Sequence, residues 1–191
     1  KDNFNTDLEG DGAFICQNSW GDNFGENGFF YISYYDTNIG THNVVYTDIE
    51  NTDNYDHIYQ SDLCGWVGQL GYNKDSIYGA NVFTAEGNET LKAASFYATG
   101  KDSQYELYVV RQFEDETSLE KMIPVASGKL GNAGYYTVDF NQGIEVDAGE
   151  RYAVVLYIIT PGSVHPMAIE YAADEATENV DLDDGESYIS A

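Results

Sequence analysis

Residues 12–36 hold the most specific pattern of hydrogen-bonding side chains in the chain, with Asn18, Ser19 and Trp20 at the centre. An asparagine amide both donates and accepts hydrogen bonds, so its chemistry is to hold another group in place. In the simplest interpretation Asn18 caps a turn and Trp20 packs in a core. The apolar runs 13–16 and 29–35 predict two strands, and a tight loop between them is indicated by Gly21, Gly25 and Gly28.

The order of residues around Asn18 matches a known pattern. Asn18-Ser19-Trp20-Gly21, followed by Phe24-Gly25-Glu26-Asn27-Gly28-Phe29-Phe30, resembles the stretch around the catalytic asparagine of papain-like cysteine peptidases. The resemblance implies that Asn18 orients a catalytic histidine beside a cysteine thiolate, and that Trp20 shields this hydrogen bond from water. Phe24 stands where papain has a second tryptophan, which preserves an aromatic plug.

The same resemblance places the nucleophilic cysteine and the catalytic histidine upstream of the asparagine, and only 17 residues precede Asn18. We therefore expect the chain to start inside the peptidase domain and to be inactive by itself. The parent protein is expected to be a cysteine-type peptidase. The alternative is a non-catalytic carbohydrate- or protein-binding surface module, in which the peptidase remnant only supports a sandwich.

Other residues that could do chemistry are scattered. Cys64-Gly65-Trp66 lacks the second cysteine of a papain nucleophile motif and follows Asn18, so we interpret Trp66 as a packing residue and Cys64 as unreactive. Cys16 is expected to be a small buried hydrophobe. The three histidines lack metal-ligand spacing and are interpreted as structural: His42, His57 and His165.

We expect no cofactor, with calcium as the alternative. The acidic run 174–186 could supply oxygen ligands, but its spacing fails the EF-hand pattern, and charge runs are usually solvated. The candidate calcium ligands are Asp181, Asp183, Asp184 and Glu186.

The strong negative charge of the chain limits the kinds of partner it can bind. The formal net charge is −25 in 191 residues, which repels phosphate backbones and anionic lipids, and no apolar run is long enough to span a membrane. We therefore expect neither nucleic-acid binding nor membrane insertion. The expected partners are a peptide or protein substrate of the intact enzyme and a glycan or cell-surface ligand. The expected location is extracellular or on a bacterial cell surface.

Short alternating runs predict strands through most of the chain. The candidates are 80–86, 91–99, 104–112, 122–129, 134–141, 151–160, 165–172 and 186–190. Such spacing predicts an antiparallel β-sandwich of jelly-roll or Greek-key type, with a doubly covered central strand at 152–159. Residues 114–121 are expected to form either one short helix or a loop. In the turns 131–134 and 147–150, the glycines just before a strand are expected to adopt positive φ: Gly131, Gly134 and Gly149.

Residues 44–66, 80–85 and 89–97, with later segments, resemble the lectin-like domain that follows the catalytic domain in some bacterial papain-like peptidases. The expected fold is therefore mainly β: the last strands of a papain-like domain followed by a lectin-like sandwich. The expected domains are a peptidase remnant at 1–36, an extended connector at 37–75 and the sandwich at 76–191. Aromatic side chains that could stack on sugars are Tyr72, Tyr78, Tyr135, Tyr136 and Tyr157.

Overall fold

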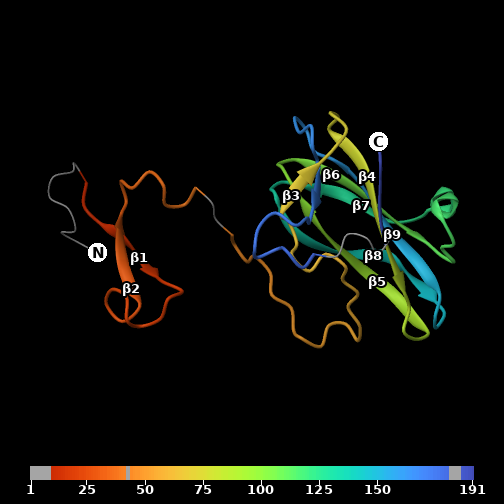
Figure 1. Cartoon of the computed structure of the whole chain (residues 1–191), viewed down its shortest axis with the longest axis horizontal. Helices are drawn as coiled ribbons and strands as arrows, with labels where there is room; N and C mark the ends of the chain where they lie inside the picture. Colours follow the sequence, from red (N-terminus) through yellow and green to blue (C-terminus); the bar gives the residue numbers. More distant parts are fainter. Residues whose placement is uncertain (1–9, 42–43, 181–185) are drawn as a thin grey trace. The chain divides into compact units, whose positions relative to one another are not determined.

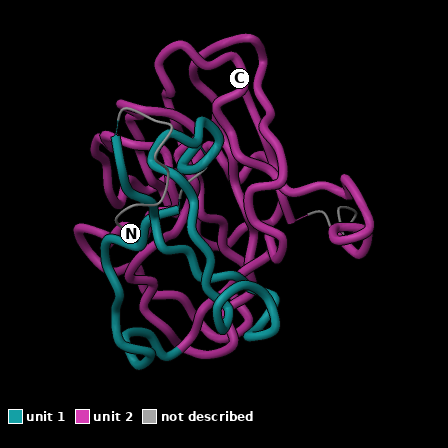
Figure 2. Tube along the Cα trace, turned by 90° about the vertical axis from the view of Figure 1, so that its left-hand side faces the viewer, with its two compact units in different colours: residues 1–56 teal, residues 57–191 magenta. Residues whose placement is uncertain are grey.

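The computed structural model describes residues 10–41, 44–180 and 186–191 (Figure 1). The chain divides into two compact units, Lys1–Asp56 and His57–Ala191 (Figure 2). This division does not coincide with the expected limits at residues 36 and 75, and the three-part division stays a prediction.

The first unit is built on one pair of antiparallel strands, β1 (Ala13–Gln17) and β2 (Phe29–Ser33). The two predicted strands are thus confirmed, and the loop between them turns with positive φ at Gly21, Gly25 and Gly28. Position 25 requires a glycine for two reasons. Its φ is +66°, and an added Cβ would lie 2.2 Å from the carbonyl oxygen of Phe29.

Past β2 the first unit holds no further strand in its described residues. Val44, Val45 and Tyr46, the apolar patch of this segment, are exposed. The next strand of the chain is β3 (Gly68–Leu70), a short element that pairs with β10 (Met167–Ile169).

The second unit contains a five-stranded antiparallel sheet in the order β11-β4-β9-β6-β7. Its strands are β4 (Ser76–Thr84), β6 (Ser103–Val110), β7 (Ile123–Leu130), β9 (Arg151–Ile159) and β11 (Ser187–Ser190). A second, two-stranded sheet pairs β5 (Glu89–Ala98) with β8 (Gly134–Val146). All eight predicted strands are present with shifted ends, so the mainly β, antiparallel fold is confirmed.

Buried side chains from both sheets and from β10 form one core, which includes Phe96, Leu107, Phe140, Ile158 and Met167. Because side chains alternate along a strand, the other face of the five-stranded sheet carries a separate set. That outer face holds a smaller cluster around Val82, Phe113 and Val155. Central strand β9 contributes to both faces, as predicted for a doubly covered strand.

The predicted short helix is a 3₁₀ helix, η1 (Glu116–Lys121), and Asp115 caps its start. Of the two turns where glycines were expected to adopt positive φ, the expectation holds for Gly149, at +78°. It is wrong for Gly131 and Gly134, whose φ angles lie outside the left-handed region. No helix in the described ranges is long and apolar enough to cross a membrane.

Candidate functional site

Asn18 lies directly after β1, where the chain enters the glycine-rich loop. Its side-chain amide is fixed at both ends by backbone groups. Nδ2 donates to the carbonyl of Gly28 at 2.7 Å, and Oδ1 accepts the backbone N–H of Trp20 at 2.5 Å. The backbone N–H of Asn18 also donates to the Gly28 carbonyl, at 2.8 Å. The orientation of the amide is therefore set by the hairpin itself.

This arrangement leaves Asn18 able to bind a further group. An amide oxygen has two lone pairs, and only one is used by the Trp20 N–H. A ring N–H approaching from the open side could take the second. The turn-capping interpretation and the orienting interpretation are thus compatible, because the cap itself holds the acceptor still.

Three aromatic rings of this hairpin contact one another in sequence. Trp20 meets Phe24 edge to face with ring centroids 5.0 Å apart, and Phe24 meets Phe30 in the same way at 5.7 Å. Trp20 is 76% exposed, so it is not part of a core within this unit. The expectation that its indole covers a hydrogen bond made at Asn18 stays a prediction.

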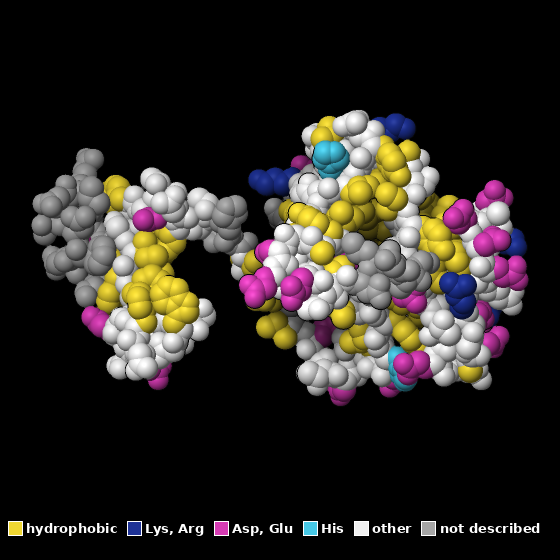
Figure 3. All heavy atoms as spheres, in the orientation of Figure 1, with side chains coloured by type: hydrophobic (Ala, Val, Ile, Leu, Met, Phe, Trp, Pro, Cys, Tyr) yellow, Lys and Arg dark blue, Asp and Glu magenta, His cyan; other side chains and the backbone are white. Residues whose placement is uncertain are grey.

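The strand pair exposes apolar side chains on both of its faces. Phe14 is 49% exposed, Ile15 64% and Phe29 40%, although neighbouring residues of a strand point to opposite faces. The space-filling view shows hydrophobic side chains gathered on the visible face of this unit (Figure 3). A two-stranded sheet is at best marginally stable by itself, so these faces need further protein to cover them.

The predicted sugar-stacking residues are separated by the fold. Tyr78 and Tyr157 meet on the outer face of the five-stranded sheet, stacked with centroids 4.3 Å apart. Tyr135 lies on the other sheet, 4.8 Å from Tyr97. Tyr136 packs against the main core and donates from its hydroxyl to the Asn132 carbonyl. Tyr72 is exposed.

Sequence reasoning missed one aromatic row on the two-stranded sheet. Trp66, interpreted as a packing residue, lies 6.0 Å from Tyr97, which pairs with Tyr135 across the sheet. Trp66 is still 37% exposed and Tyr135 60% exposed. Strand register brings Tyr97 and Tyr135 together, and Trp66 contacts Tyr97 from the segment before β3. No local motif could therefore have identified the three rings.

Cys16 is not fully buried, contrary to expectation, and His165 is exposed. Cys16 and Cys64 are both free thiols; Cys16 is half-buried and Cys64 is exposed. His57 lies 3.3 Å from a Glu86 carboxylate oxygen. His42 lies outside the described residues.

Among the described ranges no group of three or more His, Cys, Asp or Glu side chains could hold a metal ion. Asp181, Asp183 and Asp184 lie outside those ranges, so the calcium alternative stays a prediction.

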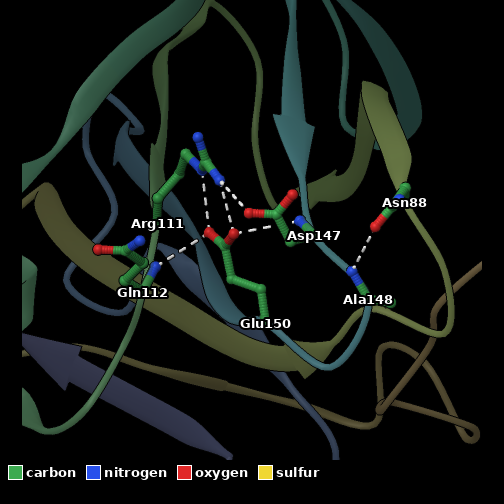
Figure 4. A network of polar contacts seen from close by, with 6 residues as sticks. All are labelled: Asn88, Arg111, Gln112, Asp147, Ala148 and Glu150. Atoms are coloured by element: carbon green, nitrogen blue, oxygen red, sulfur yellow. Dashed lines mark hydrogen bonds and ion pairs between the residues drawn. The ribbon is translucent and has the colours of Figure 1, made fainter.

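A polar network that the sequence did not indicate joins two loops of the sandwich (Figure 4). Arg111 donates twice to Glu150, from Nε at 2.9 Å and from an Nη at 2.6 Å. The backbone N–H groups of Gln112 and Asp147 also donate to this carboxylate. These bonds, led by the one from Arg111, lower the pKa of Glu150 to about 2. The network stabilises the fold by joining the loop at Arg111 and Gln112 to the loop at Asp147 and Glu150.

Most of the chain matches a known protein family. The family described as "Lectin like domain" matches residues 58–191. No curated protein matches the chain.

Two solved structures resemble the whole fold. One is the clostridial cysteine protease Cwp84 after propeptide cleavage, with a TM-score of 0.73 and 24% identity over 98% of this chain and 47% of that chain. The other contains the cysteine protease and lectin-like domains of Cwp84, a surface layer associated protein of Clostridium difficile. It has a TM-score of 0.70 and 22% identity over 98% of this chain and 42% of that chain. At this identity the likeness establishes the fold alone, and the chain spans less than half of either structure.

Proposed function

Because the chain belongs to the lectin-like domain family through residues 58–191, we propose that it joins a lectin-like sandwich to the histidine-orienting strands of a papain-like cysteine peptidase. In the parent enzyme an upstream cysteine thiolate attacks the scissile carbonyl, and an upstream histidine transfers the proton. The sandwich serves as an accessory binding or positioning module.

The observation that carries the proposal is the fixed amide of Asn18. Two backbone bonds hold it, one oxygen lone pair is open, and Trp20, whose backbone N–H makes one of these bonds, has an exposed side chain. In a Cys-His-Asn arrangement the third residue keeps the imidazole in the correct tautomer and orientation. Asn18 meets that requirement without any rearrangement of its own loop.

The exposed faces of β1 and β2 support the same proposal. Side chains as apolar as Phe14 and Ile15 are seldom left in water on both sides of a strand pair. Burial by the rest of a peptidase domain accounts for both faces at once. It also brings Asn18 against the segment that carries the histidine.

The proposed location is extracellular or on the cell surface. The Cwp84 structures of similar fold come from a surface layer associated protein. A net charge of −25 disfavours nucleic acid as a partner and is compatible with a peptide or protein substrate.

The test is to read the coding sequence upstream of Lys1, express the complete protein and treat it with a thiol-reactive peptidase probe. We expect labelling at an upstream cysteine, and no labelling of the 191-residue chain at Cys64. A reading frame that encodes no upstream cysteine and histidine, or a complete protein inert to both probe and peptides, would overturn the proposal. In that case the alternative of a non-catalytic binding module would account for the chain.

A further inference from the structure

The outer face of the five-stranded sheet carries a row of polar and aromatic side chains. In the register of the sheet, Glu106 of β6 lies opposite Ser127 of β7 on one side and Tyr157 of β9 on the other. Tyr157 in turn lies opposite Tyr78 of β4. These residues alternate with Tyr105 and Leu107, which pack into the core, so the row belongs to the solvent side of the sheet.

A shallow hollow of about 270 Å³ opens on this face. Side chains of three adjacent strands line it, among them Gln104, Glu106, Ser127, Lys129, Tyr157 and Ile159. This volume lies below the roughly 300–1,000 Å³ of typical ligand pockets, so the hollow could hold at most a single small ring.

The lining combines a flat ring with hydrogen-bonding groups. Stacking on Tyr78, at an interplanar angle of 26°, fixes the ring of Tyr157 beside the hollow. Gln104 and Ser127 can donate or accept, and Glu106 accepts. Lys129 makes no ion pair within the described part of the chain and so offers a spare donor in a strongly acidic protein.

The carboxylate of the hollow is held in place. The hydroxyl of Tyr108 donates to Glu106, and this bond is the main cause that raises the pKa of Tyr108 to about 12. The phenol therefore stays protonated at neutral pH and keeps Glu106 oriented. A held acceptor beside a fixed ring is an arrangement that loses little freedom when a ligand binds.

We propose that this hollow is a binding subsite for one sugar ring of a neutral glycan. The apolar face of a pyranose would lie on Tyr157 and Ile159, and its hydroxyls would reach Gln104, Glu106, Ser127 and Lys129. The charge of the chain disfavours acidic polysaccharides. The inference rests on the binding role proposed for the sandwich, and it does not depend on peptidase chemistry.

The test is titration of the 191-residue chain with chitotriose, maltotriose and mannotriose, followed by NMR shifts of backbone amides. We expect at least one of these sugars to bind and to shift the amides of Ser127 and Lys129. The double variant Gln104→Ala/Lys129→Ala should weaken that binding about tenfold, through the loss of two hydrogen-bonding groups. Both side chains are exposed, so the variant retains the fold.

Tyr135→Ala tests the competing position, because Tyr135 was also predicted as a sugar-stacking residue and is an exposed aromatic of the other sheet. It should leave sugar binding unchanged. Three outcomes overturn the proposal: none of the three sugars binds, Tyr135→Ala abolishes binding while the double variant does not, or trigalacturonate binds more tightly than every neutral sugar. None of these outcomes bears on the proposed peptidase role. Failure of the sugar-subsite proposal can therefore be distinguished from failure of the peptidase proposal.

Discussion

Glu150 shows how a single side chain stabilises the sandwich. Its carboxylate is only 6% exposed and accepts from Arg111 and from two backbone N–H groups. Since the pKa of Glu150 is lowered to about 2 in the folded protein, the unfolded chain binds this proton more readily. Its contribution to stability is therefore complete above a pH of about 4.5 and is lost as the pH falls towards 2.

Glu150→Gln should lower the free energy of unfolding at pH 7 by about 2 kcal/mol, because the acceptor of Arg111 loses its charge and the ion pair is lost. The difference from the wild type should shrink between pH 4.5 and pH 2 in urea unfolding. Asp147→Asn is the control: this carboxylate is 81% exposed and 3.6 Å from Arg111, so less than about 0.5 kcal/mol should be lost. Equal losses for both variants would contradict the role assigned to Glu150.

Single residues also mark the limit of what the sequence could predict. Asn18 and Trp20 belong to one local motif, and their placement in the loop after β1 follows from residues within a few positions. Tyr97 and Tyr135 come together only through strand pairing, and Trp66 reaches Tyr97 from a segment distant in the sequence. Contacts of this kind depend on register, which the pattern of each strand does not specify.

At the scale of elements, turn geometry offers a clean comparison. Gly131 and Gly149 both precede strands, and an added Cβ would meet nothing within 4 Å at either position. They differ in φ, because Gly149 alone is in the left-handed region. Gly149→Ala should therefore cost about 1 kcal/mol of unfolding free energy, and Gly131→Ala should be nearly neutral or slightly stabilising.

Thermal or urea unfolding of the two alanine variants would measure this difference. If Gly131→Ala destabilised the chain as much as Gly149→Ala, backbone conformation would not be what distinguishes these turns.

The strands themselves were largely predictable, and the errors have physical causes. Alternation identified every strand of the large sheet. β3 was missed because three residues, one of them glycine, show no periodicity. β8 runs to Val146, past the predicted end at 141, and the added stretch includes Gly143. In the structure a Cβ at Gly143 would lie 2.5 Å from the Thr90 methyl, so this glycine permits close strand packing.

At the scale of the whole molecule, the two units differ in how well each buries its own apolar side chains. Residues 57–191 have a buried core, whereas residues 10–41 expose apolar faces around two strands. The segment between them has no strand in its described part, and Tyr46 is 83% exposed. Exposed extended backbone is where proteases cut first.

Limited chymotrypsin digestion of the 191-residue chain should therefore cleave first between residues 44 and 56. It should leave a resistant fragment that starts close to His57 and keeps the β circular dichroism spectrum. Mass spectrometry would identify the cut. Early cleavage inside β4, β6 or β9, with residues 10–41 protected, would show that the stable unit had been assigned wrongly.

The proposed role of Asn18 is tested most directly by the kcat of the complete protein on a peptide substrate, compared for the wild type, Asn18→Ala and Asn23→Ala. Asn23 lies in the same loop, exposed, and makes none of the bonds that hold Asn18. A loss of about 10²-fold for Asn18→Ala with little change for Asn23→Ala is predicted, because a misoriented imidazole reacts poorly. Wild-type kcat in Asn18→Ala would contradict the account.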